Sequence, residues 1–161
     1  MVFKIGVEEF ALDIGLTKEI VVMREITPVP QTLEFVAGVM NLRGNLVPVL
    51  DLRKRLRAGK VNAHSGMRII IANHDGKQTG LIVDGASEVV RAGDEMIEPP
   101  PDVITEIGAD YIQGIVNLNE RFITLLDLGQ ALAGDIEHEL DEVMRLVSSG
   151  LPGTLAPAKA V

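Results

Sequence analysis

FVAGVMNLRGNLVPVLDLRKRL, residues 35–56, and YIQGIVNLNERFITLLDLGQAL, residues 111–132, are two copies of one pattern. Aligned without a gap, they share a Gly, an Asn, an Asp and four Leu, and most other positions exchange one apolar residue for another. A repeat of this kind indicates one structural unit used twice. The sequence therefore predicts two similar lobes with a groove between them in which a partner can bind.

The composition favours a core of strands. Of the 161 residues, 47% are hydrophobic, yet the chain has one Tyr and no Trp. A core built from Val, Ile and Leu suits pleated, half-buried strands. Short apolar runs separated by turn signals, such as Arg43-Gly44 and Asn119-Glu120, predict about ten short strands with little helix. The expected fold class is all-β, with two small five-stranded barrels related by the repeat.

The same pattern predicts the domain boundaries. We expect one two-lobed domain over residues 1–135, with a first barrel lobe over about 1–66 and a second over about 67–135. Residues 57–66 are polar and small, which is typical of a linker. Apolar residues three or four apart then predict a C-terminal helix over 136–148. Residues 149–161 are small and contain Pro and Gly, so we expect a flexible tail.

Charge separates the two halves of the chain. Residues 1–66 carry nine Lys/Arg and seven Asp/Glu, a balance of +2, whereas residues 67–161 carry six and sixteen, a balance of −10. This asymmetry suits two different partners, although an acidic half also simply keeps a protein in solution. The net charge of −8 argues against nucleic acid as the main partner.

We also expect neither a signal peptide nor insertion into a membrane, because no apolar run approaches the ~20 residues that a bilayer requires. The absence of Cys fits a reducing, cytoplasmic compartment.

Reactive groups are not arranged for chemistry. His64, His74 and His138 have no partner at metal-ligand spacing, so the sequence predicts solvated histidines and no metal. Asp51 and Asp127, related by the repeat, are each predicted to cap a short helix rather than to act as a catalytic pair. We predict no catalytic residue and no cofactor, which leaves a binding module.

A basic cluster follows the first copy of the repeat, and it consists of Arg53, Lys54, Arg55, Arg57 and Lys60. Two interpretations stay open. The cluster is either a patch for an acidic partner or anionic membrane, or a solvated helix end where the dipole favours positive charge. The second interpretation is the one that we favour from the sequence.

Several motifs resemble those of one family in the right order. GVMNLRG at 38–44 with VPVLDL at 47–52, GVEEFALDI at 6–14, GLIVD at 80–84 and YIQG at 111–114 are similar to the CheW-type chemotaxis coupling proteins. The resemblance covers residues 2–132. It implies two SH3-like five-stranded barrels, no enzymatic activity and no cofactor. It also implies two partners, the cytoplasmic tip of a methyl-accepting chemoreceptor and the regulatory domain of a CheA-type histidine kinase, and hence a location at the membrane-proximal receptor array.

Carried over by position, the resemblance implies two binding surfaces. The receptor-facing residues would be Val21, Val22, Met23 and Arg43, with Glu25 expected to hold the Arg43 side chain. The kinase-facing residues would be Glu98 and Val103, and Glu98 stands where the family can have a basic residue. For Val21, Val22 and Met23 the alternative is plain barrel core. For Arg43 the alternative is an exposed, weakly stabilising ion pair.

Other functions stay open at this stage. The chain could be a CheW-like adaptor of a different receptor–kinase pathway, such as one for surface motility. It could be a piece of a longer coupler that carries a receiver domain, although residues up to 161 give no sign of one. A small barrel enzyme or ligand sensor would need a pocket with convergent polar groups, and the sequence offers no residues to line it.

Overall fold

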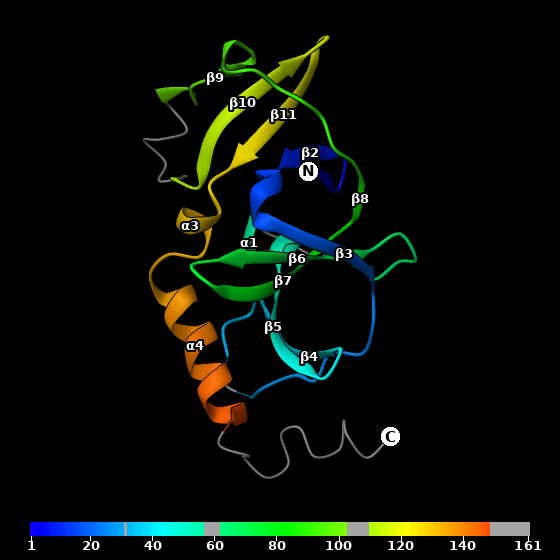
Figure 1. The fold of residues 1–161 in the computed structure, drawn as a ribbon, viewed down its shortest axis with the longest axis vertical. Coiled ribbons are helices and arrows are strands. Elements are labelled where there is room, and N and C mark those ends of the chain that lie inside the picture. Colours follow the sequence, from blue (N-terminus) through cyan, green and yellow to red (C-terminus); the bar gives the residue numbers. More distant parts are fainter. Residues whose placement is uncertain (31, 57–61, 103–109, 149–161) are drawn as a thin grey trace.

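The computed structural model describes residues 1–30, 32–56, 62–102 and 110–148, and the chain folds into two curved sheets and a C-terminal helix (Figure 1). The strands are β1 (Val2–Ile5), β2 (Glu8–Ala11), β3 (Thr17–Val22), β4 (Val36–Leu42), β5 (Asn45–Asp51), β6 (Arg68–His74), β7 (Lys77–Val83), β8 (Gly85–Glu88), β9 (Ile97–Glu98), β10 (Ile112–Leu118) and β11 (Arg121–Leu126). The helical segments are η1 (Ile14–Leu16), α1 (Leu52–Leu56), η2 (Asp94–Met96), α3 (Leu128–Ala131) and α4 (Asp135–Ser148). The predicted all-β class with a C-terminal helix is confirmed.

The lobes are not consecutive in sequence. One sheet has the order β3-β6-β7-β5-β4, and the other has the order β8-β1-β2-β11-β10-β9. We call the first the inserted lobe, because its strands lie within residues 17–83, and the second the split lobe, because β1 and β2 join strands from the other end of the chain. The sheets therefore do not follow the predicted division at residues 66 and 67.

Strand exchange explains this difference. The last strand of each repeat pairs in parallel with a hairpin from the other half of the chain: β5 with β7 and β11 with β2. The repeat pattern specifies two similar hairpins, β1–β2 and β6–β7. It does not specify which copy of the repeat each hairpin joins, because their alternation of apolar residues is alike.

The hairpin turns follow the prediction. Arg43-Gly44, Asp75-Gly76 and Asn119-Glu120 each have two successive residues with positive φ, between 51° and 86°. Two such residues form the type I′ turn, whose twist matches that of the flanking strands. Arg43 is therefore held at the outer tip of the β4–β5 hairpin in a conformation that non-glycine residues adopt infrequently.

Each sheet curls until its edges meet. In the inserted lobe, the segment after β3 crosses to the opposite edge, where Thr27 exchanges two backbone hydrogen bonds of 2.8 and 2.9 Å with Val39 of β4. In the split lobe, β9 plays the same part, because Glu98 and Ile97 pair with Ile115 and Val116 of β10. Closure removes the exposed edges that apolar strands would otherwise offer.

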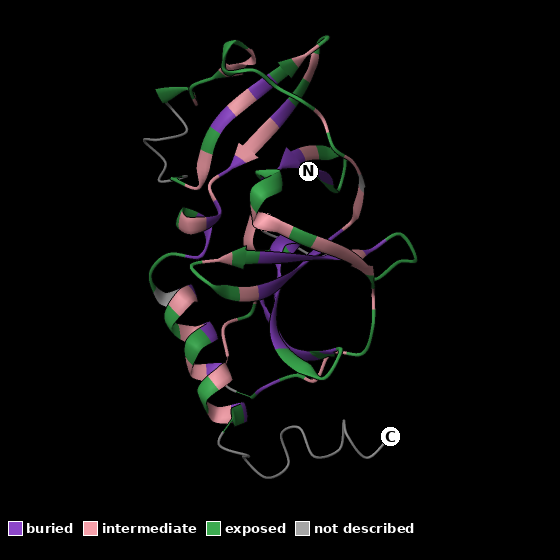
Figure 2. Cartoon of the chain, in the orientation of Figure 1, coloured by how far each residue is buried: buried purple, intermediate pink, exposed green. Residues whose placement is uncertain are grey.

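Three groups of buried side chains result. One fills the inserted barrel, around Met40, Val49, Ile69 and Ile82, and a smaller one fills the split barrel, around Val2, Val116 and Ile123. The largest group lies between the lobes and joins Phe3 and Leu12 of the split lobe to Ile70 and Leu81 of the inserted lobe. Figure 2 shows buried segments concentrated where β5, β6 and β7 cross the middle of the molecule. The lobes thus share one apolar layer.

Helix α4 extends this shared layer. Its buried side chains Ile136, Leu140, Val143 and Val147 lie three or four residues apart and join the group between the lobes. The helix packs beside β5 (Figure 1). Lys77 Nζ, at the start of β7, lies 2.9 Å from Oδ1 of Asp141 on the helix. The helix therefore covers the outer face of the β4–β5 hairpin.

Candidate functional site

The exposed tip of the inserted lobe carries an arginine with a fixed direction. Both terminal nitrogens of Arg43 donate to the carboxylate of Glu19, at 2.6 and 2.7 Å. The Arg43 side chain is 69% exposed, while that of Glu19 is 22% exposed. The hydrogen bond from Arg43 lowers the pKa of Glu19 below its ordinary value. The pair spans from β3 to the β4–β5 turn and presents the guanidinium to solvent.

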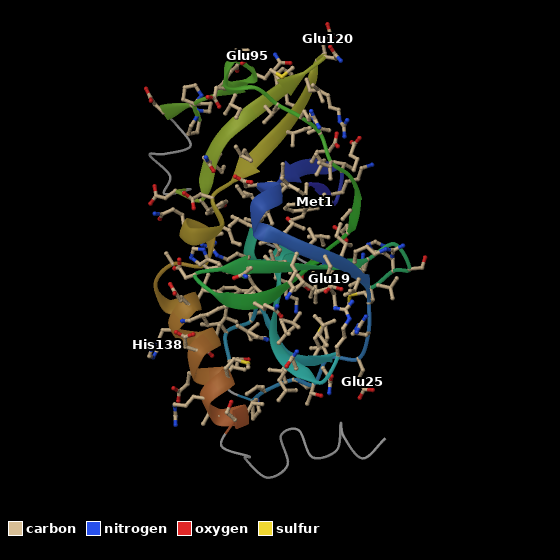
Figure 3. The ribbon with its side chains drawn as sticks, viewed as in Figure 1. Met1, Glu19, Glu25, Glu95, Glu120 and His138 are labelled. Carbon is tan, nitrogen blue, oxygen red and sulfur yellow. The ribbon has the colours of Figure 1, made fainter. Side chains whose placement is uncertain are left out.

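The prediction that Glu25 holds the Arg43 side chain is wrong. Glu25 lies beyond the end of β3 on the segment that crosses the barrel, and Figure 3 shows it toward the end of the inserted lobe that carries β4, away from Glu19. Glu25 is exposed, and the bidentate contact of Arg43 goes to Glu19 instead. The sequence contained a usable signal, because Glu19 interrupts the apolar run of β3 on the side that also carries Val21.

The predicted apolar residues of the receptor-facing surface divide by strand alternation. Val21 and Met23 are half-buried and pack against the core of the inserted barrel. Val22 points the other way and is 59% exposed. Val22 and Arg43 are therefore exposed, whereas Val21 and Met23 fit the core interpretation. Glu19, two residues before Val21, lies on the same side of β3 as Val21 and opposite to Val22.

The split lobe presents a different surface. Glu98 is exposed and pairs with Ile115, which pairs in turn with Thr124. Two residues further along the same hairpin, Asn117 pairs with Phe122. Paired residues and those two apart share one face of a sheet, so Glu98 and Phe122 lie on the same outward face. Val103, the other predicted kinase-facing residue, lies outside the described residues.

Phe122 is the functional candidate that the sequence analysis missed. Phe122 is 61% exposed, and its counterpart in the first repeat, Leu46, is 37% exposed. Among the described residues, α4 packs beside the hairpin of Leu46, where Leu140 and Pro48 line one pocket. The face of Phe122 carries no such helix in the described part of the chain. The alignment of the two copies, with an aromatic at an outward position, was the available signal.

The split lobe also has an arginine at its hairpin turn. Arg121 contacts both Glu9 of β2 and Glu88 of β8. The hydrogen bonds that Arg121 donates to Glu9 and Glu88 raise the pKa of Arg121. Like Glu19, Glu88 lies on the edge strand of its sheet, so an Arg–Glu contact ties the closing hairpin to that strand in both lobes.

Two of the three described residues of the basic cluster, Arg53 and Arg55, do not form a solvated helix end. The Arg53 side chain is only 5% exposed and forms an ion pair with Asp51. The guanidinium of Arg55 lies over two aromatic rings, while Lys54 between them is exposed. The favoured interpretation was therefore wrong for both arginines. Arg57 and Lys60 lie outside the described residues.

The two repeat-related aspartates are helix caps, as predicted. Asp51 Oδ1 accepts from the backbone N–H of Arg53 at 3.1 Å, and Asp127 Oδ1 accepts from that of Gln130 at 3.1 Å. Such bonds satisfy N–H groups that a helix leaves free at its start. The local geometry thus explains both carboxylates without a catalytic role.

Two of the three histidines are solvated, as expected. His64 and His138 are exposed, with His64 Nε2 2.8 Å from Asp84, whereas His74 is half-buried beside Asp75. Within the described ranges, no group of three or more His, Cys, Asp or Glu side chains is placed to hold a metal ion. No helix in the described part of the chain is both long and apolar enough to cross a bilayer.

A pocket between α4 and the β6–β7 hairpin is lined by His74, Lys77, Leu140 and Asp141, among others. Of its charged side chains, Lys77 and Asp141 pair with each other, while Glu137 also lines the pocket. The ion pair of the pocket is thus directed within the protein and not at a ligand.

Comparison with known proteins agrees with this architecture. The CheW-like domain family matches residues 1–135. The chain is 33% identical to the chemotaxis protein CheW of Treponema pallidum over 130 residues, covering 78% of this chain and 76% of that protein. It is 31% identical to the CheW of Klebsiella aerogenes over 145 residues, covering 90% and 87%.

A solved structure is also similar. It is the crystal structure of the scaffolding protein TtCheW from Thermoanaerobacter tengcongensis, with a TM-score of 0.77 and 38% identity, covering 84% of this chain and 92% of that one. Two closed barrels with separate exposed surfaces thus define a scaffold of the CheW type. The chain belongs to the CheW-like family.

Proposed function

We propose that this protein is a non-enzymatic adaptor that couples chemoreceptors to a CheA-type histidine kinase in chemotaxis. The observation that carries the proposal is the presence of two chemically different exposed surfaces on two closed barrels. The relatives in the comparison are named chemotaxis proteins, which favours chemotaxis over another receptor–kinase pathway.

The surface proposed for the receptor combines an apolar and a charged group. Val22 offers an exposed apolar contact at the end of β3, and Arg43 offers a guanidinium held by Glu19. A held arginine loses less conformational entropy on binding than a free one. Such a surface fits the cytoplasmic tip of a chemoreceptor if that tip presents an apolar residue beside an acceptor group.

The surface proposed for the kinase lies on the split lobe. Phe122 supplies an exposed aromatic ring, which is the kind of residue that often dominates binding energy at an interface. Glu98 supplies a negative charge on the same face. We infer that the regulatory domain of the kinase offers an apolar pocket for Phe122 and that a basic group near it would favour Glu98.

The mechanism follows from the separation of these surfaces. β3 and β9 belong to different lobes and lie apart in the molecule (Figure 1). Receptor and kinase can therefore bind at the same time, and the bound receptor raises the effective concentration of the kinase beside it. A receptor signal changes kinase activity only if the two receptor states differ in their contacts with the adaptor.

The absence of catalysis is part of the proposal. Asp51 and Asp127 serve as caps, and Glu19 and Asp84 pair with basic groups. These carboxylates are accounted for by structural contacts. We also propose that the protein lies in the cytoplasm and reaches the receptor array by binding its partners, not by inserting into the membrane.

A reconstitution with purified partners tests the proposal. The receptor tip and the kinase regulatory domain are titrated separately and together with this protein. We expect two binary complexes and one ternary complex. Val22→Asp should weaken only the receptor complex, and Phe122→Ser only the kinase complex. The proposal fails if neither partner binds the wild-type protein, or if both partners compete for one surface.

A further inference from the structure

Asp84 connects the two lobes through a single carboxylate. The residue lies where the chain passes from β7 of the inserted lobe to β8 of the split lobe. Its Oδ2 accepts a hydrogen bond of 2.6 Å from the backbone N–H of Gly6 in the β1–β2 turn. Its Oδ1 lies 3.1 Å from Arg53 Nη1 and 2.8 Å from His64 Nε2. One oxygen therefore binds the split lobe and the other binds the inserted lobe.

Arg53 anchors this carboxylate to the inserted lobe. Its Nε and Nη2 each lie 3.0 Å from an oxygen of Asp51, at the end of β5. Its Nη1 also donates to the backbone carbonyl of Asn62 at 2.7 Å. Bidentate contacts of this kind fix direction as well as contributing energy. The Arg53 side chain is thus oriented by its own lobe before it reaches Asp84.

Arg55 makes a second connection, two residues further along α1. Its guanidinium carbon lies 5.9 Å from the centre of the Phe35 ring and 5.0 Å from the centre of the Tyr111 ring. Both distances are in the range of cation–π contacts. Phe35 precedes β4 of the inserted lobe and Tyr111 precedes β10 of the split lobe. The side chain therefore contacts both lobes.

The repeat shows that this arrangement belongs to one copy only. Phe35 and Tyr111 are the first residues of the two copies. Their carbonyls accept equivalent hydrogen bonds from the backbone N–H groups of Asp51 and Asp127, at 2.7 and 2.8 Å. The counterparts of Arg53 and Arg55 in the second copy, however, are Gly129 and Ala131. The two short helices thus differ where α1 meets the other lobe, and closure of a barrel does not explain the arginines.

From these contacts we propose that Arg53, Arg55 and Asp84 form an interlobe joint, a set of directional contacts that fixes the angle between the two partner-binding surfaces. The apolar layer between the lobes holds them together but is non-directional. Hydrogen bonds and ring contacts restrict rotation across that layer. The consequence for signalling rests on the proposed function, because a fixed angle matters when two partners bind at once.

The geometric part is tested without any partner. Because the chain has no Cys, Lys18→Cys on β3 and Gln113→Cys on β10 place one spin label on each lobe. Double electron–electron resonance spectroscopy then gives the distribution of distances between the two labels. The joint is altered by Asp84→Asn and, separately, by Arg55→Gln. The matched control is Lys54→Gln, which removes an exposed charge between Arg53 and Arg55.

We expect a narrow distribution in the wild type and the Lys54→Gln control, and a broader or split distribution in both joint variants. Both variants should fold, since Arg53 keeps its bidentate contact with Asp51 in each of them. Amide exchange of the β6–β7 and β10–β11 hairpins checks this directly. An unchanged distribution in folded Asp84→Asn and Arg55→Gln would overturn the joint. If Asp84→Asn does not fold, the distance distribution of Arg55→Gln alone decides whether the joint exists.

Binding experiments separate this inference from the proposed function. Each joint variant should keep its binary affinity for the receptor tip and for the kinase domain. Simultaneous binding of both partners should weaken by about tenfold, because effective concentration depends on geometry. If the wild type binds neither partner, the proposed function fails while the resonance result still decides the joint. Equal ternary affinity in a variant with a broadened distribution would refute the link to signalling.

Discussion

Gly38 of β4 lies directly beneath the backbone of Thr27, so closely that a Cβ on Gly38 would sit 2.1 Å from the Thr27 carbonyl oxygen. Its φ of 139° also lies in the region that favours glycine. Gly114, the counterpart of Gly38, has the same relationship to Glu98, with 2.8 Å between the corresponding atoms. The glycine shared by the two copies therefore marks the place where each barrel closes.

Replacing either glycine should open its barrel. We expect Gly38→Ala to destabilise the protein by about 3 kcal/mol or more, since both a backbone clash and an unfavourable φ oppose it. Gly114→Ala should be milder, because its clash is smaller. Urea denaturation measures both. Gly85→Ala is the control, as a Cβ there meets nothing within 4 Å. Equal stability of Gly38→Ala and Gly85→Ala would contradict this account of closure.

Neighbouring residues of β3 should respond oppositely to the same change. Val22→Asp places a charge on an exposed position, so the variant should fold and lose receptor binding. Val21→Asp places the charge against the core of the inserted barrel and should cost about 2 kcal/mol or more. Circular dichroism melts and titration with the receptor tip distinguish the two. A destabilised Val22→Asp, or a folded Val22→Asp that binds normally, would argue against the receptor-facing assignment.

The Arg43–Glu19 pair should matter for binding more than for stability. Exposed ion pairs contribute little to folding, so Arg43→Ala and Glu19→Gln should melt close to the wild type. Receptor binding should fall by about tenfold in Arg43→Ala and less in Glu19→Gln, where the arginine remains but is no longer held. Glu25→Gln serves as the control and should bind normally. Normal receptor binding by folded Arg43→Ala would show that the Arg43–Glu19 pair has no part in that binding.

Phe122→Ser should affect one partner alone. The ring is largely exposed, so its removal should leave the melting temperature nearly unchanged. Binding of the kinase regulatory domain should weaken by about tenfold or more, as expected for an aromatic residue at the centre of an interface. Leu46→Ser, at the repeat-equivalent position on the other lobe, tests whether the effect is local. Similar losses of kinase binding in both variants would indicate a general effect on folding.

Acid should weaken the contacts of Asp84. Burial alone would raise the pKa of Asp84, but the hydrogen bonds from His64, the Gly6 N–H and Arg53 outweigh it and hold the pKa below the ordinary value of 3.8. A carboxyl whose folded-state pKa is lowered contributes stability above its unfolded pKa and loses that contribution as pH falls through the folded pKa.

The stability difference between the wild type and Asp84→Asn should therefore be constant near neutral pH and shrink below pH 3.8. Urea denaturation across this range, performed on both proteins, measures it. A difference that stays constant down to the acid transition would mean that Asp84 does not interact as a carboxylate.

Some features followed from local sequence alone. The β-rich composition, the type I′ turns such as Arg43-Gly44, the caps at Asp51 and Asp127 and the amphipathic pattern of α4 all depend on residues near one another in the chain. Alternation also predicts that adjacent residues of a strand such as Val21 and Val22 face opposite ways, although it does not say which one faces the core. These features are local because turns, caps and strand periodicity are local.

Tertiary structure decided the remainder, because each case depends on which distant segments meet. Two hairpins of the same pattern could have joined either copy of the repeat, and only the parallel pairing of β5 with β7 and β11 with β2 assigned them. The partner of Arg43 was Glu19 and not Glu25, since the chain turns away after β3. The sequence predicted that Arg53 and Arg55 of α1 are solvated. Packing of the split lobe against α1 instead gives Arg53 a contact with Asp84 and Arg55 a contact with Tyr111.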